Sequence, residues 1–271
     1  MIHPDALGEF KDGAASLVAL SDLLASRRVA PKTVAASLGS VIDACDAVLT
    51  SSATLTQDVL EATADYPEAA AEIRAAYDQT AAAVKTLENE AFAALAAPVD
   101  ARVRLVLERA AYEACGRLAT ALLIGDLFIL ATKPRPVSVR VADVLSFGPT
   151  PAEGPQVIRA TLQVPLEPIT TSDPRLLRAL VELGLQIVAK AGVEHPHIDA
   201  EVRSPTGACV RMHEAPGAVN ASPPFGSNPV LLVRRVLFLG PVSNLWGAAA
   251  KMGGILTDLN AEQTAVTLEL P

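Results

Sequence analysis

Residues 170–192 read TTSDPRLLRALVELGLQIVAKAG, and this stretch decides the fold class of the C-terminal half of the chain. Asp173 and Pro174 predict the start of a helix. An aspartate side chain can accept hydrogen bonds from the first free N–H groups, and proline suits the first helical turn. The helix is expected to run to about Ala191, where a glycine follows.

Strands are predicted on both sides of this helix. Residues 156–165 alternate apolar and polar side chains, which is typical of a half-buried strand. A turn at Ser204-Pro205-Thr206-Gly207 separates two expected strands, and a glycine pair precedes two more. The expected elements are a short helix or strand at 137–145, strands at 197–203 and 208–213, a long loop at 215–229, a helical region at 229–252, and strands at 255–260 and 264–270. This half is therefore predicted to be an α+β sandwich, one sheet with helices on one face.

The first 133 residues differ in composition, since they hold 33 of the 49 alanines and only four of the 20 prolines. Alanine is the best helix former and proline the worst, so this part is predicted to be all-helical. Helices are expected at 5–27, at 31 to about 64, at 67–96 and at 99–132. Short turns imply antiparallel hairpins at about 5–64 and 67–132. The narrow alanine-rich stripes favour a homodimer through these helices. The hinge Lys133-Pro134-Arg135-Pro136 divides the chain into domains 1–133 and 134–271.

Composition also excludes several classes of protein. The net charge of −8 argues against a nucleic-acid partner. The longest apolar candidate for a membrane span, Leu118 to Ala131, contains Asp126 and is shorter than the roughly 20 residues that a bilayer needs, so no membrane insertion is expected. The three cysteines, Cys45, Cys115 and Cys209, lack the spacing of metal ligands. A cytoplasmic location and no bound metal are therefore expected.

Three strings, in their order along the chain, resemble bacterial sensor histidine kinases. LLIGDLFILATKPRPVSVRVADVL at 122–145 is similar to the end of a dimerisation helix that runs into the ATPase domain. Residues 170–192 are similar to the segment of the N box, and MGGILTDLNAEQTAVTLELP at 252–271 is similar to the end of the domain. The resemblance implies a GHKL ATPase-like α/β sandwich after a helical dimerisation part.

The residues at the nucleotide-binding positions depart from that family. Leu183 and Ile187 stand where the family has asparagines, and Ile187 offers no oxygen to Mg²⁺. A shift of one residue would place Glu182 and Gln186 there instead. The adenine-reading motif and the phosphate-binding glycine motif are also degraded, at positions His213, Ala215, Gly217 and Gly240. We therefore expect no ATP binding, no cofactor and no catalytic residue.

A subgroup of this family, the bacterial cell-cycle histidine phosphotransferases (ChpT-like), has an ATPase-like domain that no longer uses nucleotide. Its first helix carries a His-Asp pair. FKDGAASLVALSDLL at 10–24 is similar, but Lys11 stands where the phosphorylated histidine belongs, followed by the matching Asp12. The resemblance therefore implies a degenerate phosphoacceptor position.

The chain has four histidines, and three of them fall near the predicted strands. His195 and His197 flank Pro196. They are interpreted as exposed imidazoles in a turn, with a metal pair as the alternative. His213 and Glu214 could form an acid/base pair, but a residue of the degraded nucleotide motif is the preferred interpretation.

The leading functional hypothesis is a catalytically degenerate histidine-kinase- or phosphotransferase-like protein in two-component signalling. It would bind a response-regulator receiver domain or a histidine kinase, without ATP hydrolysis. One alternative is an active histidine phosphotransferase or kinase that uses an unrecognised site. The other is a dimeric structural adaptor unrelated to phosphorelay.

Overall fold

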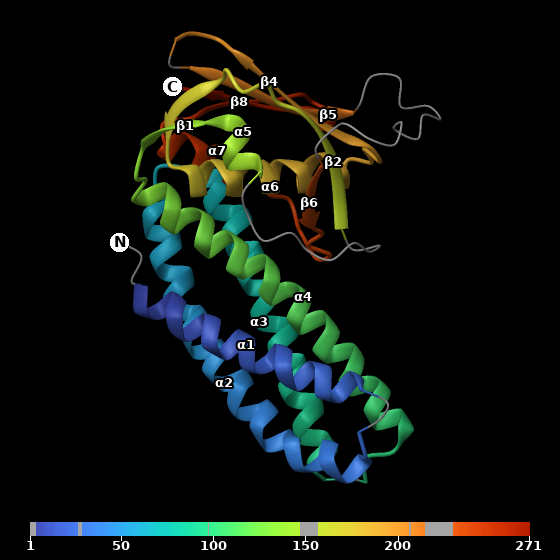
Figure 1. The fold of residues 1–271 in the computed structure, drawn as a ribbon. Helices are drawn as coiled ribbons and strands as arrows, with labels where there is room; N and C mark the ends of the chain where they lie inside the picture. The colour runs from blue at the N-terminus through green and yellow to red at the C-terminus, as the bar shows by residue number, and fades with distance from the viewer. Residues whose placement is uncertain (1–3, 27–28, 97, 147–156, 206, 215–229) are drawn as a thin grey trace. The chain divides into compact units, whose positions relative to one another are not determined.

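The computed structural model describes residues 4–26, 29–96, 98–146, 157–205, 207–214 and 230–271. The chain divides into two compact units. The helical unit comprises Met1–Asp126 and Phe238–Pro241, and the mixed unit comprises Leu127–Leu237 and Val242–Pro271. Figure 1 shows long helices in the first part of the chain and a sheet in the second. The expected α+β class is confirmed.

The helical unit is built on four long helices, and all four were predicted. They are α1 (Pro4–Ala25), α2 (Pro31–Ala62), α3 (Pro67–Leu95) and α4 (Ala101–Thr132), the last of which continues into the mixed unit. Pro31 and Pro67 occupy the first turns of α2 and α3, where a missing N–H costs no helical hydrogen bond.

Contacts along α4 show that its neighbours are antiparallel to it. The Tyr77 hydroxyl donates to the Ala121 carbonyl at 3.1 Å, and that of Thr80 donates to the Arg117 carbonyl at 3.2 Å. Toward the start of α4, the Arg104 guanidinium donates to the carbonyls of Leu24, Ser26 and Val29, where α1 ends and the turn to α2 begins. A core of Phe10, Leu38, Leu55, Ile73, Tyr77 and Leu118 is almost fully buried.

Two of these helices, α2 and α4, are long and apolar enough to cross a membrane, judged by length and composition alone. The apolar stretch expected from the sequence, Leu118 to Ala131, covers only part of α4. A core helix of a soluble protein meets the same criteria, and both helices carry buried faces here. The absence of membrane insertion therefore stays a proposal.

The segment Phe238–Pro241 belongs to the helical unit, although it comes from the C-terminal half of the sequence. The Phe238 ring packs edge-on against Tyr112, with ring centroids 5.8 Å apart. The Arg117 guanidinium lies over the same ring, 5.1 Å from its centroid. An added Cβ at Gly116 would overlap the Phe238 ring. The ring therefore rests on α4 where a side chain is missing.

The mixed unit has a six-stranded and a two-stranded sheet. The large sheet has the order β6-β2-β4-β5-β8-β7, with β2 parallel to β4 and all other pairs antiparallel. Its strands are β2 (Val157–Gln163), β4 (Pro196–Val202), β5 (Ala208–Glu214), β6 (Val230–Arg234), β7 (Leu256–Leu259) and β8 (Val266–Leu270). In the small sheet, β1 (Val137–Arg140) pairs antiparallel with β3 (Ile169–Ser172).

Three expectations for this half need correction. The helical region predicted over 229–252 is wrong in its first part, because residues 230–234 form β6 and only α7 (Ser243–Met252) is helical. β6 pairs with β2, which satisfies its backbone groups in the sheet. The single predicted sheet is wrong because β3 was missed and pairs with β1. Residues 137–145 contain both a strand and a helix, β1 followed by α5 (Val141–Ser146).

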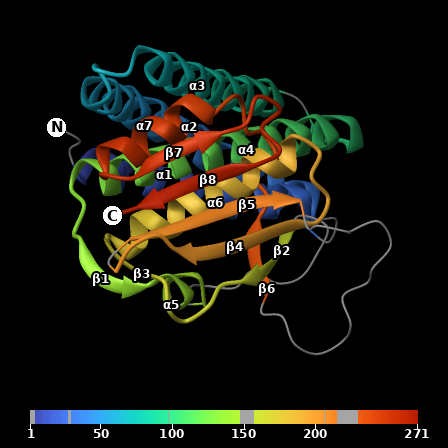
Figure 2. The same ribbon diagram turned by 90° about the horizontal axis from the view of Figure 1, so that it is seen from above.

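Helices α6 (Pro174–Lys190) and α7 lie on one face of the large sheet (Figures 1 and 2). The Asp173 carboxylate caps α6, accepting hydrogen bonds from the N–H groups of Arg175 and Leu176. Gly184 lets α6 approach β5 closely, since an added Cβ would lie 2.8 Å from Met212. The Trp246 indole on α7 donates to the Leu180 carbonyl at 2.9 Å, which joins the two helices. This framework positions Leu183 and Ile187, the α6 residues at which the resemblance predicts a degenerate nucleotide site.

Candidate functional site

Leu183 and Ile187, which the resemblance places at asparagine positions, lie on α6 in the hydrophobic core. Leu183 is 1% exposed and Ile187 is 3% exposed. Neither side chain has an oxygen, and neither is open to solvent. A hard cation such as Mg²⁺ needs oxygen ligands, so these positions offer no metal contact.

Glu182 and Gln186, which a shift of one residue would place at these positions, are not free to bind Mg²⁺ either. The Gln186 side-chain amide donates to the Arg234 carbonyl at 2.7 Å, and its oxygen accepts from the Val236 N–H at 3.1 Å. The Glu182 carboxylate lies 2.5 Å from the Arg178 guanidinium. Gln186 therefore fixes the backbone that follows β6, and Glu182 is held in an ion pair.

The cap of α6 explains why the DP pair starts the helix so sharply. The side chain of Asp173 is completely buried. Burial alone would raise the pKa of Asp173. Hydrogen bonds from the Arg175 side chain and from the N–H groups of Arg135, Arg175 and Leu176 outweigh burial and hold this pKa below its usual value. The carboxylate is therefore a structural anion, already satisfied by the protein.

At the end of β5, His213 forms a pair that the sequence analysis missed. His213 Nε2 lies 2.7 Å from Asp199 Oδ2 on β4, and Nδ1 lies 2.7 Å from the Glu214 carbonyl oxygen. Its carboxylate partner is therefore Asp199 and not the side chain of Glu214. Each ring nitrogen lies within hydrogen-bonding distance of an oxygen atom, so the protein engages both nitrogens of the imidazole.

His197 on β4 is buried, which corrects the expectation of an exposed imidazole; His195 is exposed as predicted. His197 Nδ1 lies 2.7 Å from the Thr161 hydroxyl on β2, and its ring stands edge-on to His213 with centroids 5.5 Å apart. Burial lowers the pKa of His197, and the nearby His213 lowers it further, against the opposing effect of Asp199. His197 and His213 therefore lie side by side on the neighbouring strands β4 and β5, and His197 is part of a strand and not of a turn.

The neighbourhood of His197 and His213 could have been predicted from the turn at residues 204–207, which fixes how β4 and β5 pair. Val202 pairs with Ala208 across that turn, and the same register places His197 opposite His213. Asp199 lies two residues from His197, which puts both side chains on the same face of β4. Counting back from the turn would therefore have predicted the His213–Asp199 neighbourhood.

The other positions of the expected degenerate nucleotide site are Ala215, Gly217 and Gly240. Ala215 and Gly217 lie outside the described residues. Gly240 lies in the segment Phe238–Pro241 of the helical unit, and an added Cβ there would meet no atom within 4 Å. No close approach of backbone requires a glycine at Gly240.

The predicted phosphoacceptor position is occupied by an ion pair. Lys11 Nζ lies 2.6 Å from Asp126 Oδ1, and both side chains are about half exposed, at 45% and 49%. Asp12 is exposed, and its carbonyl accepts a hydrogen bond from the Ser16 hydroxyl at 2.9 Å. Sequence reasoning missed Asp126 as the partner, because it lies 115 residues away in the chain.

Among the described residues, no group of three or more potential ligands could hold a metal ion. Cys45, Cys115 and Cys209 are free thiols. Burial, together with Glu88 and Asp46, raises the pKa of Cys45 to about 12, so this thiol stays protonated and unreactive.

No known protein-family model matches the chain, and no curated protein matches it either.

Proposed function

We propose that the chain is a catalytically degenerate relative of the histidine kinases and phosphotransferases. It acts in two-component signalling by binding a receiver domain or a histidine kinase, and it does not hydrolyse ATP. The mixed unit would then be a GHKL-like domain that serves as a scaffold. The helical unit would form a homodimer in the cytoplasm.

The placement of the family-like strings supports the proposal. The DP-opened string forms the capped helix α6. The glycine pair Gly253-Gly254 leads to β7, and β8 ends next to the final proline. The string at 122–145 runs from α4 into β1 and α5. These placements support the proposal at the level of single elements.

One observation carries the loss of nucleotide binding. The α6 positions that would face Mg²⁺ and ATP are held by Leu183 and Ile187, which are buried apolar side chains. The neighbouring Gln186 is committed to backbone hydrogen bonds. Metal binding would require these groups to leave the core, which is costly because buried apolar and hydrogen-bonded groups both stabilise the fold.

The first helix supports a binding role without phosphotransfer. Lys11 cannot replace an imidazole as a reversible phosphate carrier at neutral pH, since its ammonium group has no free electron pair. The Lys11–Asp126 pair and the exposed Asp12 leave charged groups of both signs on this face. A charged, half-exposed face suits a protein partner better than it suits a small ligand.

Incubation with phosphorylated receiver domains from the encoding organism tests the proposal. The purified chain should bind at least one receiver or kinase and should acquire no acid-labile phosphate. Replacement of Lys11 by histidine provides the matched variant, and it should accept phosphate from a receiver that the unaltered chain binds. Failure to bind any receiver, kinase or regulator would count against a signalling role. Acid-labile phosphate on the unaltered chain would instead support an active phosphotransferase.

A further inference from the structure

Strand β1 is the open edge of the small sheet. Among the described residues it pairs with β3 alone, whereas the far side of β3 is engaged, because the Thr171 N–H donates to the Pro271 carbonyl at 3.1 Å. The Val141 N–H donates to the Pro168 carbonyl, which continues the β1–β3 register by one step. A strand edge of this kind can accept another strand.

The same register identifies the backbone groups that face outward. Hydrogen-bonded and non-hydrogen-bonded pairs alternate along an antiparallel ladder. Since Val141 is bonded to its partner, Val139 and Val137 are the bonded residues within β1. The N–H and C=O groups of Ser138 and Arg140 therefore point away from β3. Outside the β1–β3 ladder, the described residues supply no backbone partner for either of them.

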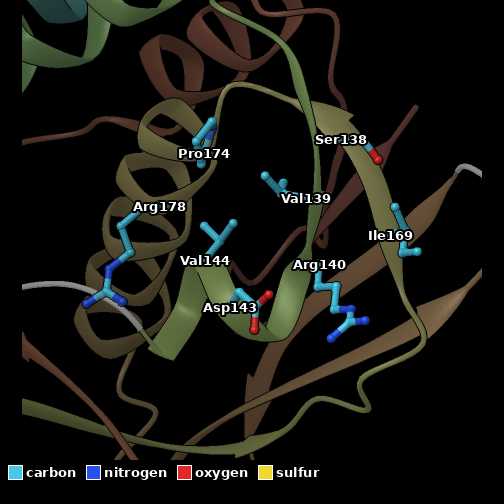
Figure 3. A pocket seen from close by; sticks show the side chains of 8 residues that line it. All are labelled: Ser138, Val139, Arg140, Asp143, Val144, Ile169, Pro174 and Arg178. Carbon is cyan, nitrogen blue, oxygen red and sulfur yellow. The ribbon is translucent and has the colours of Figure 1, made fainter.

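A hollow of about 550 Å³ lies along β1. Figure 3 shows the side chains of Val139, Val144 and Pro174 gathered around its middle, and that of Ser138 turned away from Val139. Three successive residues of β1, 138–140, line the hollow. Successive side chains of a strand point to opposite faces, so the hollow reaches Ser138 through its backbone. An apolar floor and unpaired backbone groups thus lie together.

The charged side chains that line the hollow indicate which charge a bound peptide should carry. The Arg178 guanidinium is already balanced, because it pairs with Glu182 and donates to the Leu145 carbonyl at 2.7 Å. Arg140 and Asp143 are exposed and have no ionic partner among the described residues. Arg140 belongs to β1 itself, where a residue of an added strand would lie beside it, whereas Asp143 lies beyond the strand in α5. The added strand should therefore carry an acidic residue.

We propose that β1 binds an extended peptide segment of another protein by strand addition. The backbone of Ser138 and Arg140 would pair with the peptide, and an apolar side chain would enter the hollow over Val139, Val144 and Pro174. A carboxylate of the peptide would pair with Arg140. Backbone pairing supplies affinity in this mode of recognition, and the side-chain contacts supply specificity.

Nuclear magnetic resonance of the full ¹⁵N-labelled chain tests this site. The probe is a blocked heptapeptide of alternating threonine and valine with a central glutamate, and its control carries lysine in place of glutamate. The glutamate peptide should shift the amide signals of Ser138 and Arg140, and the lysine peptide should bind roughly fivefold more weakly. Arg140→Glu should reverse this preference.

A second pair of variants separates strand addition from a simple charge effect. Ser138→Pro removes an N–H that points away from β3, so the β1–β3 ladder and the unfolding midpoint should survive, but the peptide should no longer bind. Ser138→Ala keeps the N–H and should bind like the unaltered chain. Equal binding by these two variants, a preference for the lysine peptide, or no shift at about 2 mM peptide would each overturn the proposal.

Discussion

Lys11 on α1 and Asp126 on α4 form an ion pair with 2.6 Å between Nζ and Oδ1, at the position where the resemblance expects a phosphorylated histidine. Both side chains are about half exposed, so water screens much of their attraction. Lys11→Met should lower the free energy of unfolding by about 1 kcal/mol or less, as measured by urea denaturation. The double exchange Lys11→Asp with Asp126→Lys should recover part of this loss. A loss well above 2 kcal/mol would show that the pair is structural, which would weaken its assignment to a docking face.

Magnesium-ATP should leave the melting temperature of the protein unchanged. Leu183 and Ile187 supply no oxygen ligand, and each lost charge-assisted contact costs about 1.5–3 kcal/mol of binding free energy. A micromolar site, about −8 kcal/mol, would become millimolar or weaker after several such losses. A ligand at or below its Kd adds at most about 0.4 kcal/mol to stability. The check is differential scanning fluorimetry at about 1 mM ATP, with ATP lacking Mg²⁺ as the control. An upward shift that requires Mg²⁺ would contradict the proposed loss of nucleotide binding.

Arg104 should be among the most important polar residues of the helical unit. Its guanidinium, only 16% exposed, donates to three backbone carbonyls around the end of α1 and pairs with Glu108. Arg104→Met should reduce the free energy of unfolding by about 3 kcal/mol, because it leaves carbonyls in a partly buried place without a donor. Arg102→Ala is the matched control on the exposed side of the same turn, and it should change stability by about 0.5 kcal/mol at most. Similar losses in the two variants would contradict this role for Arg104.

Stability should fall when the pH drops below about 6.5, and His197 should cause part of the fall. Its pKa in the folded protein is lowered from the usual 6.5, so the unfolded chain takes up a proton that the folded chain resists. The contribution is present in full above the unfolded pKa and is lost as the pH falls through the folded pKa. Urea unfolding at pH 7.5 and pH 5.5 measures the difference.

His197→Gln should reduce this pH dependence, because glutamine does not titrate. His195→Gln, at an exposed position two residues away, should leave it unchanged. The prediction fails if both variants retain the full difference in unfolding free energy between the two pH values.

Gly116 should reverse the usual effect of a glycine-to-alanine change within a helix. Alanine in a helix interior ordinarily stabilises by about 0.5–1 kcal/mol, and Gly39→Ala on α2, where an added Cβ meets no atom within 4 Å, should show this gain. Gly116→Ala should instead destabilise, because the new methyl group would overlap the Phe238 ring. In a Phe238→Ala background the same change should become stabilising. Additive effects of the two substitutions in a double-mutant cycle would contradict the contact.

Local signals predicted most of the elements. Pro31, Pro67 and Pro174 mark helix starts because proline fits the first turn, and the alternation at 156–165 marks β2. β6 was missed because Val230–Arg234 is a short, nearly continuous apolar run, which periodicity cannot distinguish from a helix. Its pairing with β2 decides the structure there, and a non-local contact of that kind leaves no local signal.

The candidate site was predictable only in part, for the same reason. The identities of Lys11, Leu183 and Ile187 could be judged from the sequence, since the missing functional groups are visible there. The partners Asp126 and Asp199 depend on how helices and strands align. Asp199 could be reached through the register of one hairpin, but Asp126 requires the packing of α1 against α4. The contact between Gly116 and the Phe238 ring has no sequence signal, because the two residues lie far apart in the chain and meet only in the folded structure.

The return of Phe238–Pro241 to the helical unit has a consequence for protein synthesis. A ribosome makes α1 to α4 about a hundred residues before it reaches Phe238. During that interval the newly made helices lack the ring that covers Gly116 and lies beneath the Arg117 guanidinium. Synthesis of the helical unit begins first, but its last segment, Phe238–Pro241, is made only after most of the mixed unit. A stop codon near residue 133 would therefore leave the helices without Phe238, which packs on α4.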